Sequence, residues 1–200
     1  LTSSDYSDYL SFLGGDDGLL DEKIIASSLA IVLDTATMDR VSNKAIFLAK
    51  EMIKIDHHIK TETWNAIEWI EDGRSSTCEM IAQFYSDFSS ILKIDSIAAT
   101  AIYCGMVTDS GRFSFSSTSP RTLRLASVML EKGVDVETLQ ARLDLKELSF
   151  YRYREAVFNK VKFTENGLGW VYVDSDMQEE LNLSREEASE SVSFMANIKG

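Results

Sequence analysis

The sequence predicts an α/β fold, in which a parallel sheet is flanked by helices, because two apolar runs enclose a helical pattern. Residues 29–33 form a continuous apolar run with β-branched members, typical of a strand buried on both faces of a parallel sheet. Residues 35–52 carry apolar side chains at helical spacing. Residues 52–55 form a second short apolar run. The order strand, helix, strand indicates a parallel α/β unit.

A third strand and a capped helix are expected next. The apolar stretch of residues 66–70 predicts the strand. Ser76 and Glu79 have the spacing of a capping box, in which two side chains satisfy backbone N–H groups at the start of a helix. This pair predicts a helix that runs from residue 76 to about residue 91.

Two more helices complete the predicted first domain. Residues 95–107 are apolar on nearly all sides, which indicates a helix in the interior. Pro120 stands at a first helical turn, where its missing N–H costs little. The pattern that follows predicts a helix over residues 123–131, ending at Gly133.

The remaining residues predict a linker helix and the beginning of a second α/β domain. Residues 146–163 are charged and amphipathic, and residues 168–173 have the pattern of a strand. Residues 184–187 have the spacing of a second capping box. The expected divisions are a first domain, a linker helix and the start of a second domain, over residues 1–140, 141–165 and 166–200.

Composition and charge restrict the class of function. A hydrophobic content of 44% excludes a disordered chain. The 20 basic and 32 acidic residues give a net charge of −12, which repels duplex nucleic acid and anionic lipid. No apolar run approaches the roughly 20 residues of a membrane helix, and no signal peptide is recognisable. Cys78 and Cys104 lack metal-binding spacing, so we expect a reduced, cytoplasmic protein without duplex or membrane partners.

The candidate chemistry begins with the two histidines of the sequence, His57 and His58, which directly follow Asp56. They come after a predicted strand, and ligands bind at the carboxyl ends of parallel strands in open α/β sheets. Asp34 ends the preceding strand in the same way, so these groups can meet at one edge. A carboxylate beside an imidazole is a ligand pair for a divalent ion such as Mn²⁺. A solvated turn is the alternative interpretation.

A third acidic residue, Asp109, follows the apolar helix within the stretch of residues 105–113, Gly-Met-Val-Thr-Asp-Ser-Gly-Arg-Phe. Taken alone, it is equally typical of a helix end with a C-terminal glycine. The order of Asp34, residues 56–58 and residues 105–113, with Ser-Ser-Thr-Cys-Glu at residues 75–79 between them, resembles the DHH phosphoesterase family. The likeness is closest to its branch of oligoribonucleases and pAp phosphatases.

The resemblance implies two Mn²⁺ ions at the carboxyl edge of the sheet. Asp34 would bridge both ions, and His57 and Asp109 would hold the second one. His58 would face the substrate phosphate, and Asp56 would orient the histidines. The implied reaction is in-line attack on phosphorus by a hydroxide held between the ions, without a protein nucleophile.

The sequence departs from the family pattern in two places. The first family motif, His-x-x-Pro-Asp-x-Asp, is missing, since Pro120 is the only proline and both histidines are already assigned. The C-terminal glycine-rich motif that ends in His is also missing. We expect an excerpt from a longer protein, with a natural degenerate paralogue as the alternative. In either case we expect weak metal binding and slow hydrolysis by these 200 residues alone.

Several other residues have two interpretations. Arg112 can contact a substrate phosphate or lie on the surface. Ser76, at a helix start, can hold a substrate anion or simply cap the helix. Trp64, Trp69 and Phe113 can stack on a base or pack in the core.

The leading hypothesis is therefore a Mn²⁺-dependent phosphoesterase that acts on short oligoribonucleotides, linear pApA-like dinucleotides or pAp. Metal-held small substrates suit the negative charge of the chain better than long nucleic acids do. A family II inorganic pyrophosphatase shares the same order of Asp and DHH motifs and is the first alternative. A non-catalytic nucleotide-binding module is the second. The resemblance is also compatible with a homodimer.

Overall fold

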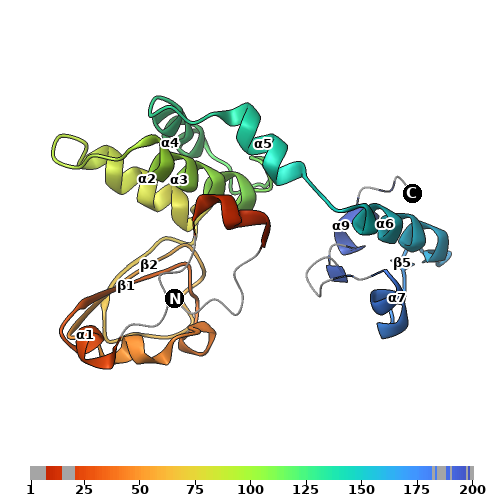
Figure 1. Ribbon diagram of the computed structural model, residues 1–200, viewed down its shortest axis with the longest axis horizontal. Coiled ribbons are helices and arrows are strands. Elements are labelled where there is room, and N and C mark those ends of the chain that lie inside the picture. Colours follow the sequence, from red (N-terminus) through yellow and green to blue (C-terminus); the bar gives the residue numbers. More distant parts are fainter. Residues whose placement is uncertain are drawn as a thin grey trace. The chain divides into compact units, whose positions relative to one another are not determined.

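The computed structural model describes residues 8–14, 21–181, 183, 188–189, 191–196 and 198. The chain divides into two compact units, Leu1–Leu143 and Asp144–Gly200 (Figure 1). Each unit is described separately below.

A three-stranded parallel sheet in the first unit confirms the predicted α/β fold. The strands are β1 (Leu29–Leu33), β2 (Glu51–Asp56) and β3 (Ile67–Ile70), hydrogen-bonded in that order. The register pairs Leu33 with Ile55. The carboxyl ends of β1 and β2 therefore lie side by side, where the predicted site residues follow.

The connection between β1 and β2 differs from the predicted helix over residues 35–52. It contains two short 3₁₀ helices, η2 (Met38–Arg40) and η3 (Lys44–Leu48). Val41 and Asn43 between them are extended, and the Asn43 side chain accepts a hydrogen bond from the N–H of Ala45. The apolar residues of this segment have helical spacing because the two 3₁₀ helices and the extended residues between them pack on the same core. That core consists of Val32, Val41, Met52 and Trp64, with Ala30, Met38, Ile46 and Ala66 around it.

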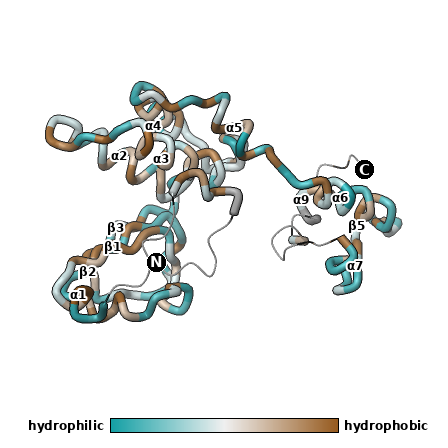
Figure 2. Tube along the Cα trace, viewed as in Figure 1, coloured by the Kyte–Doolittle hydropathy of each residue, from teal (hydrophilic) through white to brown (hydrophobic). Residues whose placement is uncertain are grey.

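Strand β1 was expected to be buried on both faces, and this expectation is wrong for the described residues. Leu29, Ile31 and Leu33 are each about half exposed, whereas Val32 is buried against the core on the other face. The strand is apolar on both faces in sequence, and Figure 2 shows the hydrophobic colouring of its trace. Within the part of the chain that the structure describes, nothing buries the outward face as deeply as the inward one.

Helices form the larger core of the first unit. Three of them pack on one another beside the sheet: α2 (Thr77–Asp87), α3 (Ser96–Asp109) and α4 (Pro120–Leu130). Their buried residues share one hydrophobic cluster, which includes Tyr103, Met106 and Met129. Helix α3 thus supplies core contacts as predicted, while α2 ends four residues earlier than expected. The remaining described helices of this unit are short: η1 (Asp8–Leu13), α1 (Glu22–Ala26) and α5 (Val136–Asp144), the last of which was not predicted.

The second unit is smaller and begins with helix α6 (Leu148–Lys160). Tyr153 and Val157 of this helix pack against Met177 in a core of their own. A short antiparallel pair, β4 (Lys162–Phe163) and β5 (Gly169–Trp170), is followed by α7 (Ser175–Glu180) and α9 (Ser191–Ala196). The strand expected over residues 168–173 is thus paired at only two positions, because its partner β4 has two residues. The capping box expected at residues 184–187 lies outside the described residues.

Among the described residues, no helix is both long enough and apolar enough to cross a bilayer.

Candidate metal centre

Asp34 follows directly after β1 and points its carboxylate toward the edge of the sheet. Its N–H donates to the carbonyl of Ile55 at 3.1 Å, which extends the ladder by one bond and fixes the backbone. The residue has a φ of 58°, a left-handed conformation that Asp tolerates better than most residues. The Thr77 hydroxyl donates to Asp34 Oδ1 at 2.8 Å. One carboxylate oxygen is therefore held from the first residue of α2.

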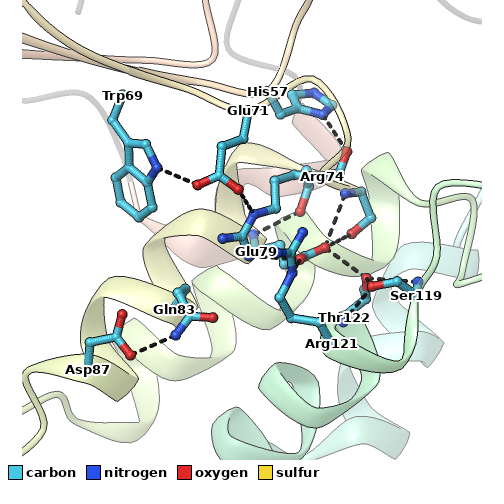
Figure 3. A network of polar contacts seen from close by, with 12 residues as sticks. His57, Trp69, Glu71, Arg74, Glu79, Gln83, Asp87, Ser119, Arg121 and Thr122 are labelled. Carbon is cyan, nitrogen blue, oxygen red and sulfur yellow. Dashed lines mark hydrogen bonds and ion pairs between the residues drawn. The ribbon is translucent and has the colours of Figure 1, made fainter.

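His57 follows β2, and a backbone carbonyl determines the orientation of its ring. Nδ1 lies 3.2 Å from the carbonyl oxygen of Arg74 (Figure 3). Since a carbonyl can only accept, this nitrogen must carry the proton. The other ring nitrogen, Nε2, lies 3.1 Å from Asp109 Oδ2 and 3.5 Å from Asp34 Oδ1. Nε2 is therefore the ring nitrogen that faces the two carboxylates.

Asp109 is the last residue of α3, so the helix delivers its carboxylate to the same edge of the sheet. Burial raises the pKa of this carboxyl above its usual value; the nearby His57 opposes the shift, and the negative charge of Asp34 adds to it. Two carboxylates in mutual repulsion favour a bound cation.

His58 and Asp56 form a second hydrogen-bonded pair beside the first. Asp56 is buried, and its Oδ1 lies 2.7 Å from His58 Nδ1 and accepts from the backbone N–H of His58 at 3.1 Å. Burial alone would raise the pKa of Asp56, but these hydrogen bonds and the charges of His58 and Lys54 lower it below its usual value. Asp56 therefore holds His58. His57 is held by the Arg74 carbonyl instead.

The donor set fits a divalent metal ion. One ligand atom from each of Asp34, His57 and His58 lies within 4.8 Å of the others, and Asp109 is in contact with His57. Imidazole nitrogen with carboxylate oxygen is a ligand combination suited to Mn²⁺ and to other borderline or hard cations. The structure thus brings together all four residues that sequence analysis placed at the edge.

A cavity of about 370 Å³ opens beside this cluster. Its lining comes from the end of β1, the start of α2 and the end of α3: Leu33, Asp34, Ser76, Thr77, Cys78, Ile81, Gly105, Thr108 and Asp109. Burial, with the charges of Asp34 and Asp109, raises the pKa of Cys78 to about 12. The thiol therefore stays protonated at neutral pH and is no nucleophile.

The remaining predicted residues occupy different places. Ser76 is buried and caps α2, since its hydroxyl accepts from the N–H of Glu79 at 2.9 Å, although it also lines the cavity. Arg112 is exposed in the turn after α3, with a φ of 59° and its N–H donating to the carbonyl of Val107. Trp64 is buried, and Phe113 packs on the helical core, so both fit the packing interpretation. Half-buried Trp69 donates through its indole to Glu71.

Sequence reasoning missed four residues that support the site. Thr77 holds Asp34, Arg74 holds His57 through its carbonyl, and Lys54 lies 3.5 Å from Asp56. Glu79, expected only as a capping residue, instead bonds Ser75, Arg74, Arg121 and Thr122. A lysine within an apolar strand was one signal in the sequence, and the Ser-Ser-Thr-Cys-Glu motif that contains Thr77 and Glu79 was another. The other contacts join segments whose proximity no local pattern reveals.

The family follows from comparison with known proteins. Residues 4–106 match the family described as DHH family, N-terminal domain. The match covers more than half of the chain, so the chain belongs to the DHH family. The resemblance inferred from the order of the motifs is thereby confirmed.

Individual relatives cover more of the chain. It is 37% identical over 151 residues to an uncharacterized protein of Mycoplasma pneumoniae, the MG371 homologue, covering 76% of this chain and 46% of the relative. It is 31% identical over 192 residues to the bifunctional oligoribonuclease and PAP phosphatase NrnA of Bacillus subtilis. This match covers 96% of this chain and 61% of the relative. The solved structure of an exopolyphosphatase-related protein from Bacteroides fragilis matches this chain with a TM-score of 0.84 at 22% sequence identity. The match covers 96% of this chain and 61% of that protein, and it supports the fold. The chain spans about half to three fifths of the length of these relatives.

Proposed function

We propose that the chain contributes the metal centre of a Mn²⁺-dependent phosphoesterase that hydrolyses short oligoribonucleotides, linear pApA-like dinucleotides or pAp. The observation that carries the proposal is the convergence of Asp34, His57 and Asp109, from three separate segments, on the carboxyl edge of a parallel sheet. The relative of Bacillus subtilis that is named for oligoribonuclease and PAP phosphatase activity supports the choice of substrate class.

In this proposal Asp34, His57 and Asp109 hold the metal, with Asp34 available to bridge two ions. Bound divalent cations would neutralise phosphoryl charge and lower the pKa of an attacking water. Neighbouring residues hold the proposed metal ligands in position. The Arg74 carbonyl fixes the His57 tautomer, and Thr77 fixes one oxygen of Asp34.

His58 has a separate role in the proposal. Its Nδ1 is held by Asp56, which leaves Nε2 as the ring nitrogen that faces a substrate phosphate oxygen. The buried Asp56 carboxylate, which also pairs with Lys54, fixes the orientation of the ring. Arg112, exposed in the turn after Asp109, is the proposed second phosphate contact.

The charge of the chain favours a small substrate over long nucleic acid. A net charge of −12 opposes binding of a duplex along the surface, whereas a bound cation attracts a phosphate locally. We keep a cytoplasmic location and the possibility of a homodimer as predictions within this proposal.

A substrate panel tests the proposal. The chain is incubated with Mn²⁺ and a diribonucleotide, pAp or inorganic pyrophosphate, and the products are separated chromatographically. We expect slow hydrolysis of the diribonucleotide or pAp, abolished by a chelator, and at least about a hundredfold loss in His57→Ala. Lys60→Met, at an exposed lysine that pairs with Glu68, is the control and should keep the activity. Preferred release of phosphate from pyrophosphate would identify the pyrophosphatase alternative, and undiminished activity in His57→Ala would exclude the proposed ligand.

A further inference from the structure

A buried carboxylate outside the metal cluster is surrounded by donors. Glu79 of α2 is completely buried, and Figure 3 shows it at the centre of a polar network. Its Oε1 accepts from the guanidinium of Arg74 at 3.0 Å and from that of Arg121 at 3.1 Å. Its Oε2 accepts from the N–H and the hydroxyl of Ser75 at 3.1 and 2.8 Å, and from the Thr122 hydroxyl at 2.8 Å.

Capping of α2 does not account for this arrangement. The Ser76 hydroxyl already caps the helix by accepting from the N–H of Glu79. In a capping box the glutamate would bond the N–H of Ser76 in return. Glu79 bonds the N–H of Ser75 instead, one residue earlier, and also reaches Thr122 on α4. The carboxylate is therefore directed at the peptide group that precedes the helix.

That peptide group is shared with the candidate metal centre. The N–H of Ser75 and the carbonyl of Arg74 belong to one planar peptide unit, so they point in opposite directions and rotate together. The N–H is bonded to Glu79, and the carbonyl accepts from His57 Nδ1 at 3.2 Å. Fixing one end of this unit fixes the other. The Arg74 side chain adds a second restraint through its contacts with Glu71 and Glu79.

We propose that Glu79 is a positioning residue for His57, acting through the Arg74–Ser75 peptide, and that Thr122 anchors Glu79 from α4. The inference rests on the proposed function, because it takes His57 Nε2 as the nitrogen that faces the metal. Glu79 holds the peptide so that its carbonyl selects the Nδ1–H tautomer of His57. Nε2 is then the ring nitrogen that faces Asp34 and Asp109, ready for a cation.

Thr122 gives the cleanest variant, because Glu79→Gln would place an amide among donors and could prevent folding. Thr122 is buried and contacts Glu79 and Ser119 but none of the four metal-centre residues. Thr122→Val removes the hydroxyl at nearly constant volume. Thr122→Ser keeps the hydroxyl and is the matched control. Arg121→Met, at a partly exposed residue, loosens the other carboxylate oxygen and replaces Thr122→Val should that variant not fold.

Two readouts are measured on each variant: Mn²⁺ affinity by titration calorimetry, and the His57 tautomer by long-range ¹H–¹⁵N spectra of metal-free protein with neutral rings. We expect Thr122→Val to weaken Mn²⁺ binding about tenfold and to mix the His57 tautomers, while Thr122→Ser stays within about twofold of the wild type. Unchanged Mn²⁺ affinity in Thr122→Val would overturn the positioning role. A wild type that binds no Mn²⁺ would refute the proposed function instead, and the tautomer alone would then decide the positioning role.

Discussion

At the scale of single residues, the site depends on charged groups that are buried in pairs. Lys54 and Asp56 are each only 1% exposed, and Lys54 Nζ lies 3.5 Å from Asp56 Oδ2. The ammonium also donates to the carbonyl of Ala36 and lies over the ring of Trp64. Burial of either charge alone would be costly, so each is present because the other is. The pair keeps Asp56 ionised beside His58.

Removal of the Lys54 charge should therefore destabilise the first unit. We expect Lys54→Met to lower the free energy of unfolding by about 3 kcal/mol, because it leaves a buried carboxylate without its cation. Lys60→Met removes an exposed lysine paired with Glu68 and should cost less than about 1 kcal/mol. Urea unfolding measures the free energy of unfolding of both variants. Equal decreases in the two variants would show that burial does not determine how much the Lys54–Asp56 pair contributes to stability.

Glu79 should make the stability of the protein sensitive to acid. Burial alone would raise the pKa of Glu79, but hydrogen bonds from Ser75, Thr122 and Arg74 hold it below the ordinary value of 4.5. The unfolded carboxyl therefore takes up a proton at a higher pH than the folded one, so stability is present above about pH 4.5 and is lost as pH falls through the folded pKa. Glu79→Gln, which cannot titrate, should be the less stable protein at pH 7.

Urea unfolding at a series of pH values measures this effect. The difference in unfolding free energy between the wild type and Glu79→Gln should narrow as the pH falls below about 4.5. A difference that stays constant across this range would mean that the carboxylate of Glu79 is not stabilised in the folded state.

At the scale of elements, the close approach of α2 and α3 sets the spacing between Thr77 and Asp109. Gly105 of α3 lies against Cys78 of α2, and a Cβ on Gly105 would stand 2.2 Å from the Cys78 sulfur. No side chain larger than hydrogen fits here unless the Cys78 side chain or one of the helices shifts. The glycine therefore brings the end of α3 close to the start of α2, where the cavity lies.

A methyl group at this crossing should separate the helices. We expect Gly105→Ala to destabilise the protein by about 1–3 kcal/mol through overpacking. Gly73→Ala, where an added Cβ meets no atom within 4 Å, should change stability by less than about 0.5 kcal/mol. The double variant with Cys78→Ala removes the sulfur and should recover part of the loss. Thermal and urea unfolding measure all three, and a Gly105→Ala protein as stable as Gly73→Ala would contradict the packing.

The elements also differ in how far their sequences predict them. The three strands of the parallel sheet, the start of α2 at Ser76 and the start of α4 at Pro120 were predictable, because apolar runs and caps act locally. The helix expected over residues 35–52 was wrong, because Val41 and Ile46 meet the same core from separate turns. The spacing of apolar residues cannot distinguish one continuous helix from separate turns that pack on the same core, since both place apolar residues on one side.

At the scale of the whole molecule, the order of motifs predicted which residues meet, but not what holds them. Asp34, His57 and Asp109 were placed together from their order along the chain and the family resemblance. The hydrogen bond between His57 and the Arg74 carbonyl cannot be predicted from residue types, because every residue has a backbone carbonyl. The contact of Glu79 with Thr122 joins residues 43 positions apart, and no local pattern indicates it. The sequence therefore predicts the groups that converge at the edge of the sheet better than the contacts that support them.

Diffraction from crystals of the chain soaked in Mn²⁺, recorded at the manganese absorption edge, tests the metal centre most directly. The account predicts an anomalous peak bounded by the Asp34 carboxylate, His57 Nε2 and Asp109 Oδ2, and its loss in crystals of His57→Ala. An anomalous map without a peak at this edge of the sheet, at a concentration of Mn²⁺ that supports hydrolysis, would contradict it.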